Sequence, residues 1–348
     1  MSVLLTRRTA LIGSAAAALA MPNIARAAPT DLIIGTNGGE EFQSFYRAAY
    51  ASFEQKYNVR IVPVFGDGAT LLNRAIAEKD APTMDATVTF QGGWLVGQAE
   101  GVFETVDYER IPHVGDVYDF LRDPKGFAPF INFAAWGLVY NKETISKPPR
   151  SIRALWDPAY ADKVMIGGIY HWQIHLAAFA QAWGGDQTMI DLAFDKAKLL
   201  APNLAGFYGL SSDAQSKFTQ GLADIATWYS DIAQRLRAMG VPLGFQVPEE
   251  GAFLYPMSFQ AIAGTPRRDL VEKLIGHFYD PVVCQALART DGRIPGNKTV
   301  TLDAPLRDDL LSIQEVMQAH QWNWSFINAH QSDWLTRWNG DIRPLVHS

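Results

Sequence analysis

The chain has 348 residues, a formal net charge of −6, 48% hydrophobic residues and 19% charged residues. The acidic charge and the lack of a basic stripe argue against a nucleic-acid binder, and no apolar run reaches the ~18 to 20 residues that span a bilayer. The length is sufficient for two domains with a sizeable core.

Residues 1–27 are predicted to be an export signal. Arg7-Arg8 precede an Ala-rich apolar region, and Ala25-Arg26-Ala27 is an A-x-A cleavage site. The paired arginines favour twin-arginine export, and an ordinary Sec signal is the alternative. Cleavage removes three arginines and no acid, so the mature chain from Ala28 carries a charge of −9.

Strands alternate with helices in the first part of the mature chain. Strands are expected in "DLIIG", "VRIVPVFG" and "MDATVTF", and helices lie between them. One face of the first helix carries the apolar residues Phe42, Phe45, Tyr46, Ala49 and Phe53. This alternation predicts a mostly parallel, doubly wound sheet.

Two Gly-Gly turns follow the first and third of these strands. Ligands of such sheets bind beyond the carboxyl ends of the strands, so Asn37-Gly38-Gly39 and Phe90-Gln91-Gly92-Gly93 are expected on one rim. Each Gly-Gly pair lets the backbone approach a ligand closely, and two plain tight turns are the alternative.

A second strand–helix series begins after the apolar strand "FINFAAWGLVYN". The chain is predicted to return through "LGFQVPEEGAFLYPMSFQAIAG", so we expect an α/β fold of two doubly wound lobes joined by two hinge crossings, with a ligand cleft between them. The predicted boundaries are 28–135 and 257–305 for lobe 1, and 136–256 and 306–348, with the C-terminal helices, for lobe 2. Near the end, Trp334 and Trp338 form a helix stripe typical of core packing.

Several segments resemble the spermidine/putrescine-type solute-binding proteins of bacterial ABC importers. They are "FEQKYNVRIV", "GLVYNKE", "PPRSIRALWDPAYADKV", the turn "VPEEG" with its following strand, and "DGRIPGN". The resemblance runs through nearly all of the mature chain. It implies a monomeric periplasmic receptor that closes on a small solute and delivers it to a membrane permease, without a cofactor.

The resemblance also locates a site in which the family's carboxylates are replaced. By position, Tyr255 is the family's aromatic residue, but Met257 stands where an aspartate pairs with a ligand amine. A second acidic pair falls near His171 and Ile174, and aromatic Trp228 and Tyr229 remain. Aromatic walls suit cations and alkyl chains alike.

This replacement makes a polyamine less favoured than another small organic solute. An ammonium group in a closed cleft loses its hydration and needs a charge partner. Asp231 could supply one carboxylate, three residues from Trp228 on a helix, or it could be an ordinary surface acid. We therefore favour a monoamine, an amino acid derivative or a carboxylate.

The spacing of His171 and His175 raises the question of a metal. A spacing of four residues places both imidazoles on one helix face, which is a spacing that metal ligands use. The sequence offers no third ligand nearby, so ordinary histidines or a solute contact by His171 are favoured. Related receptors bind ferric iron through paired tyrosines, whereas Tyr208 and Tyr229 are not adjacent. Ser212 is a candidate solute contact, with N-capping of a helix as the alternative.

No motif of an enzyme is present. The sequence lacks G-x-S-x-G and the phosphate-loop pattern, and its single cysteine, Cys284, fits a buried structural residue better than a catalytic thiol. An exported hydrolase is the less favoured alternative. The turn at Glu249-Glu250 is interpreted as solvated surface charge. The predicted solute-binding residues are Asn37, Gly38, Phe90, Gln91, His171, Ser212, Trp228, Asp231, Tyr255 and Met257.

Overall fold

The computed structural model describes residues 28–123, 125–127, 129–168, 172–208, 211–304, 306 and 312–346. One mixed sheet runs through the molecule in the order β2-β1-β3-β10-β5-β8-β6-β7. Its strands are β1 (Thr30–Thr36), β2 (Val59–Phe65), β3 (Ala86–Thr89), β5 (Phe130–Asn141), β6 (Val164–Gly167), β7 (Leu204–Tyr208), β8 (Ile225–Tyr229) and β10 (Phe253–Ile262).

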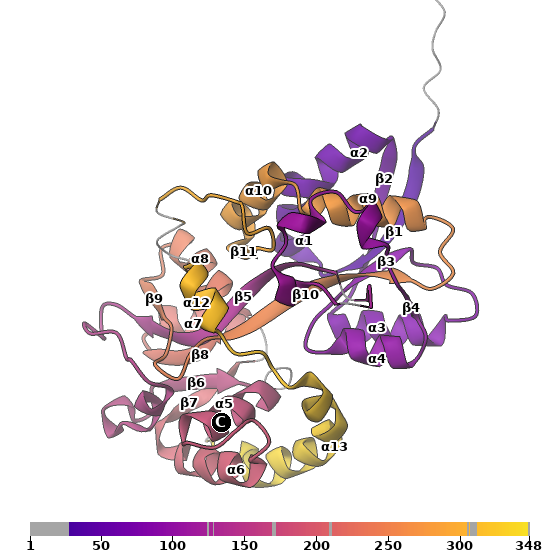
Figure 1. Cartoon of the computed structure of the whole chain (residues 1–348). Helices are drawn as coiled ribbons and strands as arrows, with labels where there is room; N and C mark the ends of the chain where they lie inside the picture. The colour runs from indigo at the N-terminus through magenta and orange to yellow at the C-terminus, as the bar shows by residue number, and fades with distance from the viewer. Residues whose placement is uncertain are drawn as a thin grey trace, which may run out of the picture.

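The sheet has a parallel group of strands at each end and an antiparallel pair in the middle. β2, β1 and β3 are mutually parallel, and so are β8, β6 and β7. Between the groups, β10 and β5 run antiparallel to each other and to their outer neighbours. We call the first group with its helices the β1 lobe and the second group with its helices the β6 lobe. This arrangement is the predicted two-lobe α/β fold with two crossings (Figure 1).

Both crossing strands are apolar because they are covered on both faces. Every residue of β5 and of β10 is buried, which explains why the two segments read as continuous hydrophobic runs instead of alternating ones. Short strands extend the sheet beside them: β4 (Phe103–Glu104) pairs with β10, while β9 (Leu243–Gln246) and β11 (Ile294–Pro295) pair with β5. The exact residues at which one lobe ends and the other begins within these crossings stay a prediction.

Helices cover both faces of the sheet (Figure 1). In the β1 lobe they are α1 (Gly39–Phe45), α2 (Ala51–Tyr57), α3 (Gly68–Ala77), α4 (Gly93–Ala99), α9 (Arg268–Phe278) and α10 (Pro281–Asp291). In the β6 lobe they are α5 (Trp172–Ala182), α6 (Ile190–Leu199), α7 (Ser211–Thr219) and α8 (Ser230–Ala238). The chain ends with α12 (Ile313–Gln318) and α13 (Trp324–Asp341). None of the described helices is long and apolar enough to cross a membrane.

The first predicted helix contains a turn of π-helix, η1 (Tyr46–Tyr50), between α1 and α2. The wider turn changes the register of the side chains, so that Tyr50 is fully buried beside Phe45 at a centroid distance of 6.2 Å. Tyr46, which the regular helical spacing placed on the buried face, is only half-buried. A π-turn in a helix shifts the apolar face by one residue, and a regular 3.6-residue period cannot predict it.

The last long helix, α13, contacts both lobes. Trp334 and Trp338 are buried, as predicted, and the Trp338 ring lies 5.4 Å from that of Phe207 in the β6 lobe. At its other end, Asn328 Nδ2 donates a hydrogen bond of 3.1 Å to the carbonyl of Gly92 in the β1 lobe. The helix therefore connects the two lobes independently of the crossing strands.

The acidic turn before β10 corrects one interpretation. Glu249 is exposed, but Glu250 is half-buried and accepts hydrogen bonds from the Ser151 hydroxyl and, at 3.1 Å, from the Ile152 amide. Glu250 thus caps the start of a short 3-10 helix instead of being solvated. Cys284 is buried, and burial raises the pKa of its thiol to about 12, which confirms a structural cysteine.

Candidate functional site

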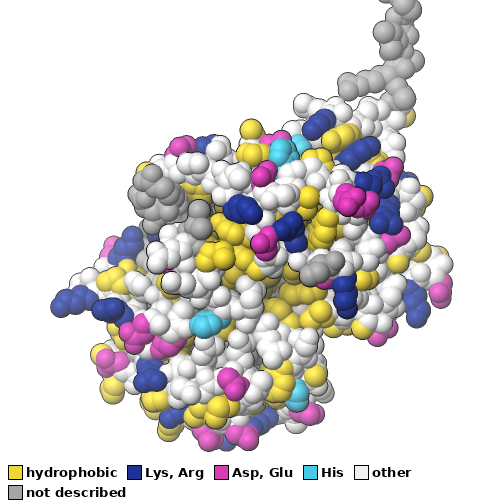
Figure 2. Space-filling view, in the orientation of Figure 1, with side chains coloured by type: hydrophobic (Ala, Val, Ile, Leu, Met, Phe, Trp, Pro, Cys, Tyr) yellow, Lys and Arg dark blue, Asp and Glu magenta, His cyan; other side chains and the backbone are white. Residues whose placement is uncertain are grey.

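A cavity of about 450 Å³ lies between the β1 lobe and the β6 lobe. Such a volume is in the range of small-molecule sites. The loops that follow β1 and β3 supply one wall, β8 and the start of α8 supply the opposite wall, and α13 contributes Ile327 and Asn328. On the face shown in Figure 2, hydrophobic side chains also gather between the two halves of the molecule.

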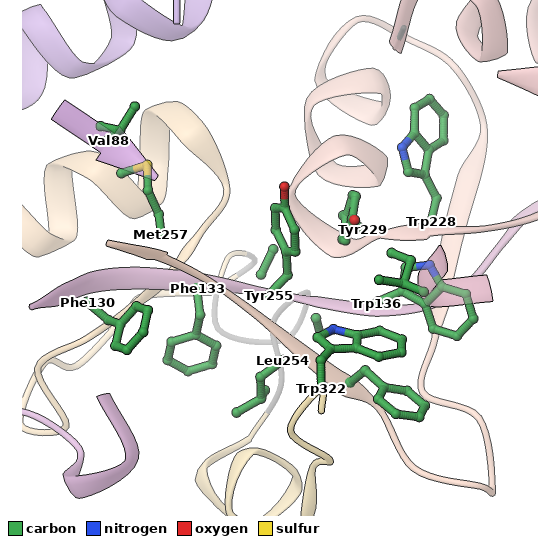
Figure 3. Close-up of a cluster of buried hydrophobic side chains, with 14 of the residues drawn as sticks. Val88, Phe130, Phe133, Trp136, Trp228, Tyr229, Leu254, Tyr255, Met257 and Trp322 are labelled. Atoms are coloured by element: carbon green, nitrogen blue, oxygen red, sulfur yellow. The ribbon is translucent and has the colours of Figure 1, made fainter. Parts of the chain in front are cut away.

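Aromatic rings from both lobes meet on β10. The Tyr255 ring lies 5.7 Å from the Phe90 ring in a stacked arrangement, and 4.3 Å from the Tyr229 ring. Figure 3 shows Tyr255, Tyr229 and Trp228 on one side of the crossing strands. Burial raises the pKa of the Tyr229 and Tyr255 hydroxyls, so both stay protonated at neutral pH and can donate hydrogen bonds.

Four charged side chains form an inner ion group behind these rings. Arg293 Nε lies 3.0 Å from Asp291 Oδ2, and Arg293 Nη2 lies 3.4 Å from Asp231 Oδ2. Arg235 Nη1 lies 3.1 Å from Asp291 Oδ1. The group thus contains two guanidinium and two carboxylate groups. Asp231, Arg235 and Arg293 also line the cavity.

Arg293 is the central member of this group, and only 7% of it is exposed. The guanidinium lies over the Phe90 and Tyr255 rings, at 5.5 and 5.9 Å from their centroids, where the ring faces attract a cation. Burial lowers the pKa of Arg293, but Asp231 and Asp291 act in the opposite direction and prevail, so its pKa lies above the ordinary value and the group stays charged.

The inner ion group leaves several buried polar atoms without hydrogen bonds. Among the described residues, Nη1 of Arg293 and Oδ1 of Asp231 have no hydrogen-bond partner. Arg293 Nε and Asp291 Oδ2 are 3.0 Å apart as an ion pair, but they do not meet hydrogen-bond geometry. Buried polar groups are nearly always hydrogen-bonded, to protein, water or ligand, because an unpaired one is costly. Arg293 and Asp231, which both line the cavity, thus keep hydrogen-bonding capacity that the described protein atoms do not use.

One more carboxylate faces the cavity from the β1 lobe. Glu41 is half-buried in α1, and its Oε1 accepts a hydrogen bond of 3.0 Å from Asn37 Nδ2. Asn37 comes from the turn after β1, and Glu41 lies four residues later. The turn after β1, which was predicted to offer backbone groups to a ligand, is thus followed by a charged side chain that also lines the cavity.

The structure places the predicted solute-binding residues in three ways. Those in the cavity wall are Asn37, Phe90, Gln91, Trp228, Asp231 and Tyr255. Gly38 is exposed beside Phe65 and is not part of the wall. His171 lies outside the described residues, and Ser212 lies in α7, where its side chain is outside the described part.

Met257 does not line the cavity either. Only 1% of it is exposed, and Figure 3 shows its side chain beside Val88 of the β1 lobe. Met257 and Tyr255 are two residues apart and share a face of β10. On this face of β10, Tyr255 is open to the cavity, whereas Met257 is covered. The pairing register between β10 and β5 shifts directly after Met257.

Arg293, Glu41 and Arg235 were not predicted from the sequence. The loop "DGRIPGN" was noted as a family segment, and an arginine directly after a Gly helix end is a signal that could have drawn attention to Arg293. Glu41 follows the predicted rim by two residues. The side chains that α13 contributes carry no comparable signal, because their place depends on how the C-terminal helix packs.

His175 has a structural environment. It is fully buried, its Nε2 accepts a hydrogen bond of 3.1 Å from the Gly167 amide, and its ring packs edge-on against Trp136 at 5.3 Å. It is not in the cavity wall. Within the described ranges, no group of three or more His, Cys, Asp or Glu side chains is placed to hold a metal ion.

Comparisons with known proteins agree with this architecture. A structure of an ABC transporter protein from Clostridium perfringens has a TM-score of 0.77 and 21% identity, covering 89% of this chain and 99% of the other. The agropinic acid complex of a periplasmic binding protein from A. tumefaciens has a TM-score of 0.73 and 17% identity, covering 90% and 98%. A GABA receptor structure has a TM-score of 0.73 and 16% identity, covering 89% and 97%.

These likenesses show the fold, and the family follows from the sequence match. No curated protein matches the chain. Residues 94–323, about two thirds of the chain, match the family described as bacterial extracellular solute-binding protein. The finer assignment to the spermidine/putrescine type stays a prediction. With the two-lobe fold and the cavity between the lobes, this match shows that the chain belongs to the family of bacterial extracellular solute-binding proteins.

Proposed function

We propose that the protein is the substrate-binding component of an ABC transporter, which captures a small organic solute in the periplasm and delivers it to an inner-membrane permease. The observation that carries this proposal is the cavity of about 450 Å³ whose walls come from both lobes. A solute that touches both walls favours the closed form over the open one, because only the closed form offers all of its contacts.

The lobe division that we propose for this closure is 28–135 with 257–305, and 136–256 with 306–348. Tyr255 lies at the border and contacts a ring from each side: it stacks on Phe90 and lies tilted against Tyr229. Relative rotation of the lobes about β5 and β10 would separate these rings, so opening and closing would directly change the aromatic wall.

Export to the periplasm is part of the same proposal. The paired arginines Arg7-Arg8 favour the twin-arginine route. Replacing both with lysine is expected to block export of the full-length chain, which immunoblots of periplasmic and cytoplasmic fractions would measure. Normal export of this variant that depends on the Sec machinery would contradict the twin-arginine route and leave the binding function untouched.

Binding is tested with the mature protein from Ala28, stripped of bound solute by partial unfolding and dialysis. Melting temperatures would be measured with amino acids and their derivatives, GABA, agropinic acid, monoamines, small carboxylates, putrescine, spermidine and ferric iron. A solute at 100 times its Kd adds about 2.7 kcal/mol of stability. A rise in melting temperature, together with a smaller radius of gyration in solution scattering, supports the proposal.

The test also decides between the alternatives. Stabilisation only by ferric iron would favour an iron receptor, although the Tyr208 hydroxyl is already engaged as a donor to the Thr227 carbonyl at 2.6 Å. Conversion of a panel compound into product would favour an exported hydrolase. The polyamine alternative requires a response to putrescine or spermidine that the monoamines do not produce.

A further inference from the structure

The charges around the cavity are balanced at one position and unbalanced at another. The inner ion group contains Arg235, Arg293, Asp231 and Asp291, whose formal charges cancel. Glu41 is not part of it. Among the described residues, no Lys, Arg or His side chain forms an ion pair with Glu41, and its hydrogen bond comes from the neutral amide of Asn37. Glu41 is therefore a half-buried carboxylate without a direct ion-pair partner among the described residues, although its negative charge helps to hold the pKa of Arg293 above its ordinary value.

A direct ion-pair partner for Glu41 would have to come from the occupant of the cavity. Glu41 lines it together with the Tyr255 and Phe90 rings. A half-buried negative charge beside aromatic faces is a favourable place for a cation, because both the charge and the ring faces attract it. Asp67 also lines the cavity, but it is exposed to solvent and accepts a hydrogen bond of 2.7 Å from the Thr70 amide at the start of α3.

The opposite requirement comes from Arg293. Its guanidinium is more than nine-tenths buried, and Nη1 has no hydrogen-bond partner among the described residues. Its two acidic neighbours leave this donor unused. A carboxylate oxygen is the acceptor that a guanidinium binds most strongly, because both groups are charged and two parallel N–H donors match its geometry.

We propose that the solute is a small zwitterion whose cationic group pairs with Glu41 and whose carboxylate accepts hydrogen bonds from Arg293. The inference rests on the proposed solute-binding function and specifies the class of solute. A diamine would place its second ammonium group beside the guanidinium of Arg293, and a dicarboxylate would place one carboxylate beside Glu41. Each would bring like charges together in a partly desolvated site.

The first test compares compounds of equal length and different charge. The stripped mature protein would be titrated with five linear series of three to six carbons: amino carboxylates, alkylamines, diamines, monocarboxylates and dicarboxylates. We expect the amino carboxylate of the best length to raise the melting temperature most, and to bind at least tenfold more tightly than its amine and its carboxylate analogues. A diamine or dicarboxylate that binds more tightly would overturn the inference.

The second test removes the charge of Glu41. Glu41→Gln keeps the shape and the hydrogen-bond acceptor, and it is expected to raise the Kd of the best amino carboxylate more than tenfold. The matching monocarboxylate, which has no cationic group, should bind no less tightly than before. The control is Glu40→Gln, because Glu40 is the neighbouring residue, is exposed, pairs with Arg47 and lies outside the cavity wall. Equal effects of the two variants on Kd would refute a direct role of Glu41.

Arg293 is tested with a conservative change, because its removal would leave two buried carboxylates without a partner. Arg293→Lys keeps the charge and loses the planar pair of donors. We expect it to weaken binding of the amino carboxylate more than tenfold and to leave binding of the alkylamine of equal length within twofold. If the variant does not fold, as judged by circular dichroism, the Glu41→Gln titration and the charge series still decide the question.

These outcomes separate the inference from the function on which it rests. If a solute of another charge class, such as a neutral sugar, stabilises and compacts the protein, the zwitterion is wrong and the solute-binding function stands. If no compound in the five series or in the wider panel binds, and mass spectrometry finds no small molecule released from protein purified without stripping, both proposals fail together.

Discussion

Gly92→Ala should separate α13 from the β1 lobe. Gly92 has a φ of +75°, a conformation that alanine disfavours, and it lies directly under the first turn of α13. A Cβ atom at this position would be 2.8 Å from the Trp324 Cβ and 2.9 Å from Asn328 Nδ2. Both distances are well below van der Waals contact, so the helix has to move.

The expected destabilisation has two parts. Left-handed backbone costs alanine about 1 kcal/mol. Displacement of the helix would weaken the edge-on contact of Trp324 with Trp94, at 6.2 Å, and the hydrogen bond from Asn328 to the Gly92 carbonyl. Such an aromatic pair contributes about 0.5–1.5 kcal/mol and such a hydrogen bond about 1 kcal/mol. The total is about 3 kcal/mol.

Gly101→Ala separates these two parts. Gly101 has a similar φ of +71°, but a Cβ there would meet nothing within 4 Å. This variant therefore carries the backbone cost alone, about 1 kcal/mol. Thermal unfolding followed by circular dichroism measures both variants, and the difference between them, about 2 kcal/mol, reports the contact between α13 and the β1 lobe.

Solution scattering gives the second measurement. If α13 holds the lobes together, Gly92→Ala should increase the radius of gyration of the solute-free protein and raise the Kd of its solute, whereas Gly101→Ala should do neither. Equal melting temperatures and equal radii of gyration for the two variants would refute the reasoning, since they would mean that the contact of Trp324 and Asn328 with Gly92 does not stabilise the closed arrangement.

Three further predictions concern buried polar groups. Glu250→Ala should lower the free energy of unfolding in urea by about 2 kcal/mol, because it removes two hydrogen bonds at the start of a 3-10 helix. The control Glu249→Ala, at the exposed neighbouring residue, should change this free energy little. Equal effects of the two variants would contradict the capping role of Glu250. Burial raises the pKa of Asp291 to about 6, although Arg293 opposes the shift. Between about pH 4 and 6 the folded protein therefore holds a proton that the unfolded chain has lost, so the stability of the wild type relative to Asp291→Asn should fall by about 2 kcal/mol as pH rises from 4 to 7. A flat difference over this range would show that the carboxylate is not desolvated. Cys284 should not react with a thiol reagent in the native state at pH 8, because its pKa of about 12 in the folded protein leaves almost no thiolate. It should react fully in urea, and rapid labelling of the native protein would contradict its burial.

Local sequence patterns were sufficient to predict the fold and one rim of the site. The alternation of strands and helices predicts a doubly wound sheet, and the apolar runs of β5 and β10 predict two crossing strands that are covered on both faces. Because the carboxyl ends of parallel strands meet at one edge, the turns after β1 and β3 also predicted that Asn37, Phe90 and Gln91 would come together, and the structure places all three in the cavity wall.

The charged groups of the site are brought together by long-range packing, which no local pattern predicts. Glu41 and Arg293 are 252 positions apart in the chain, and nothing in either local segment shows that they face one cavity. Met257 shows the converse: the period of two puts it on the same face as Tyr255, but Val88 lies beside it and covers that face (Figure 3). A periodic pattern fixes the direction of a side chain, whereas its partners depend on long-range packing, and those partners decide whether a charge is paired, buried or left for a solute.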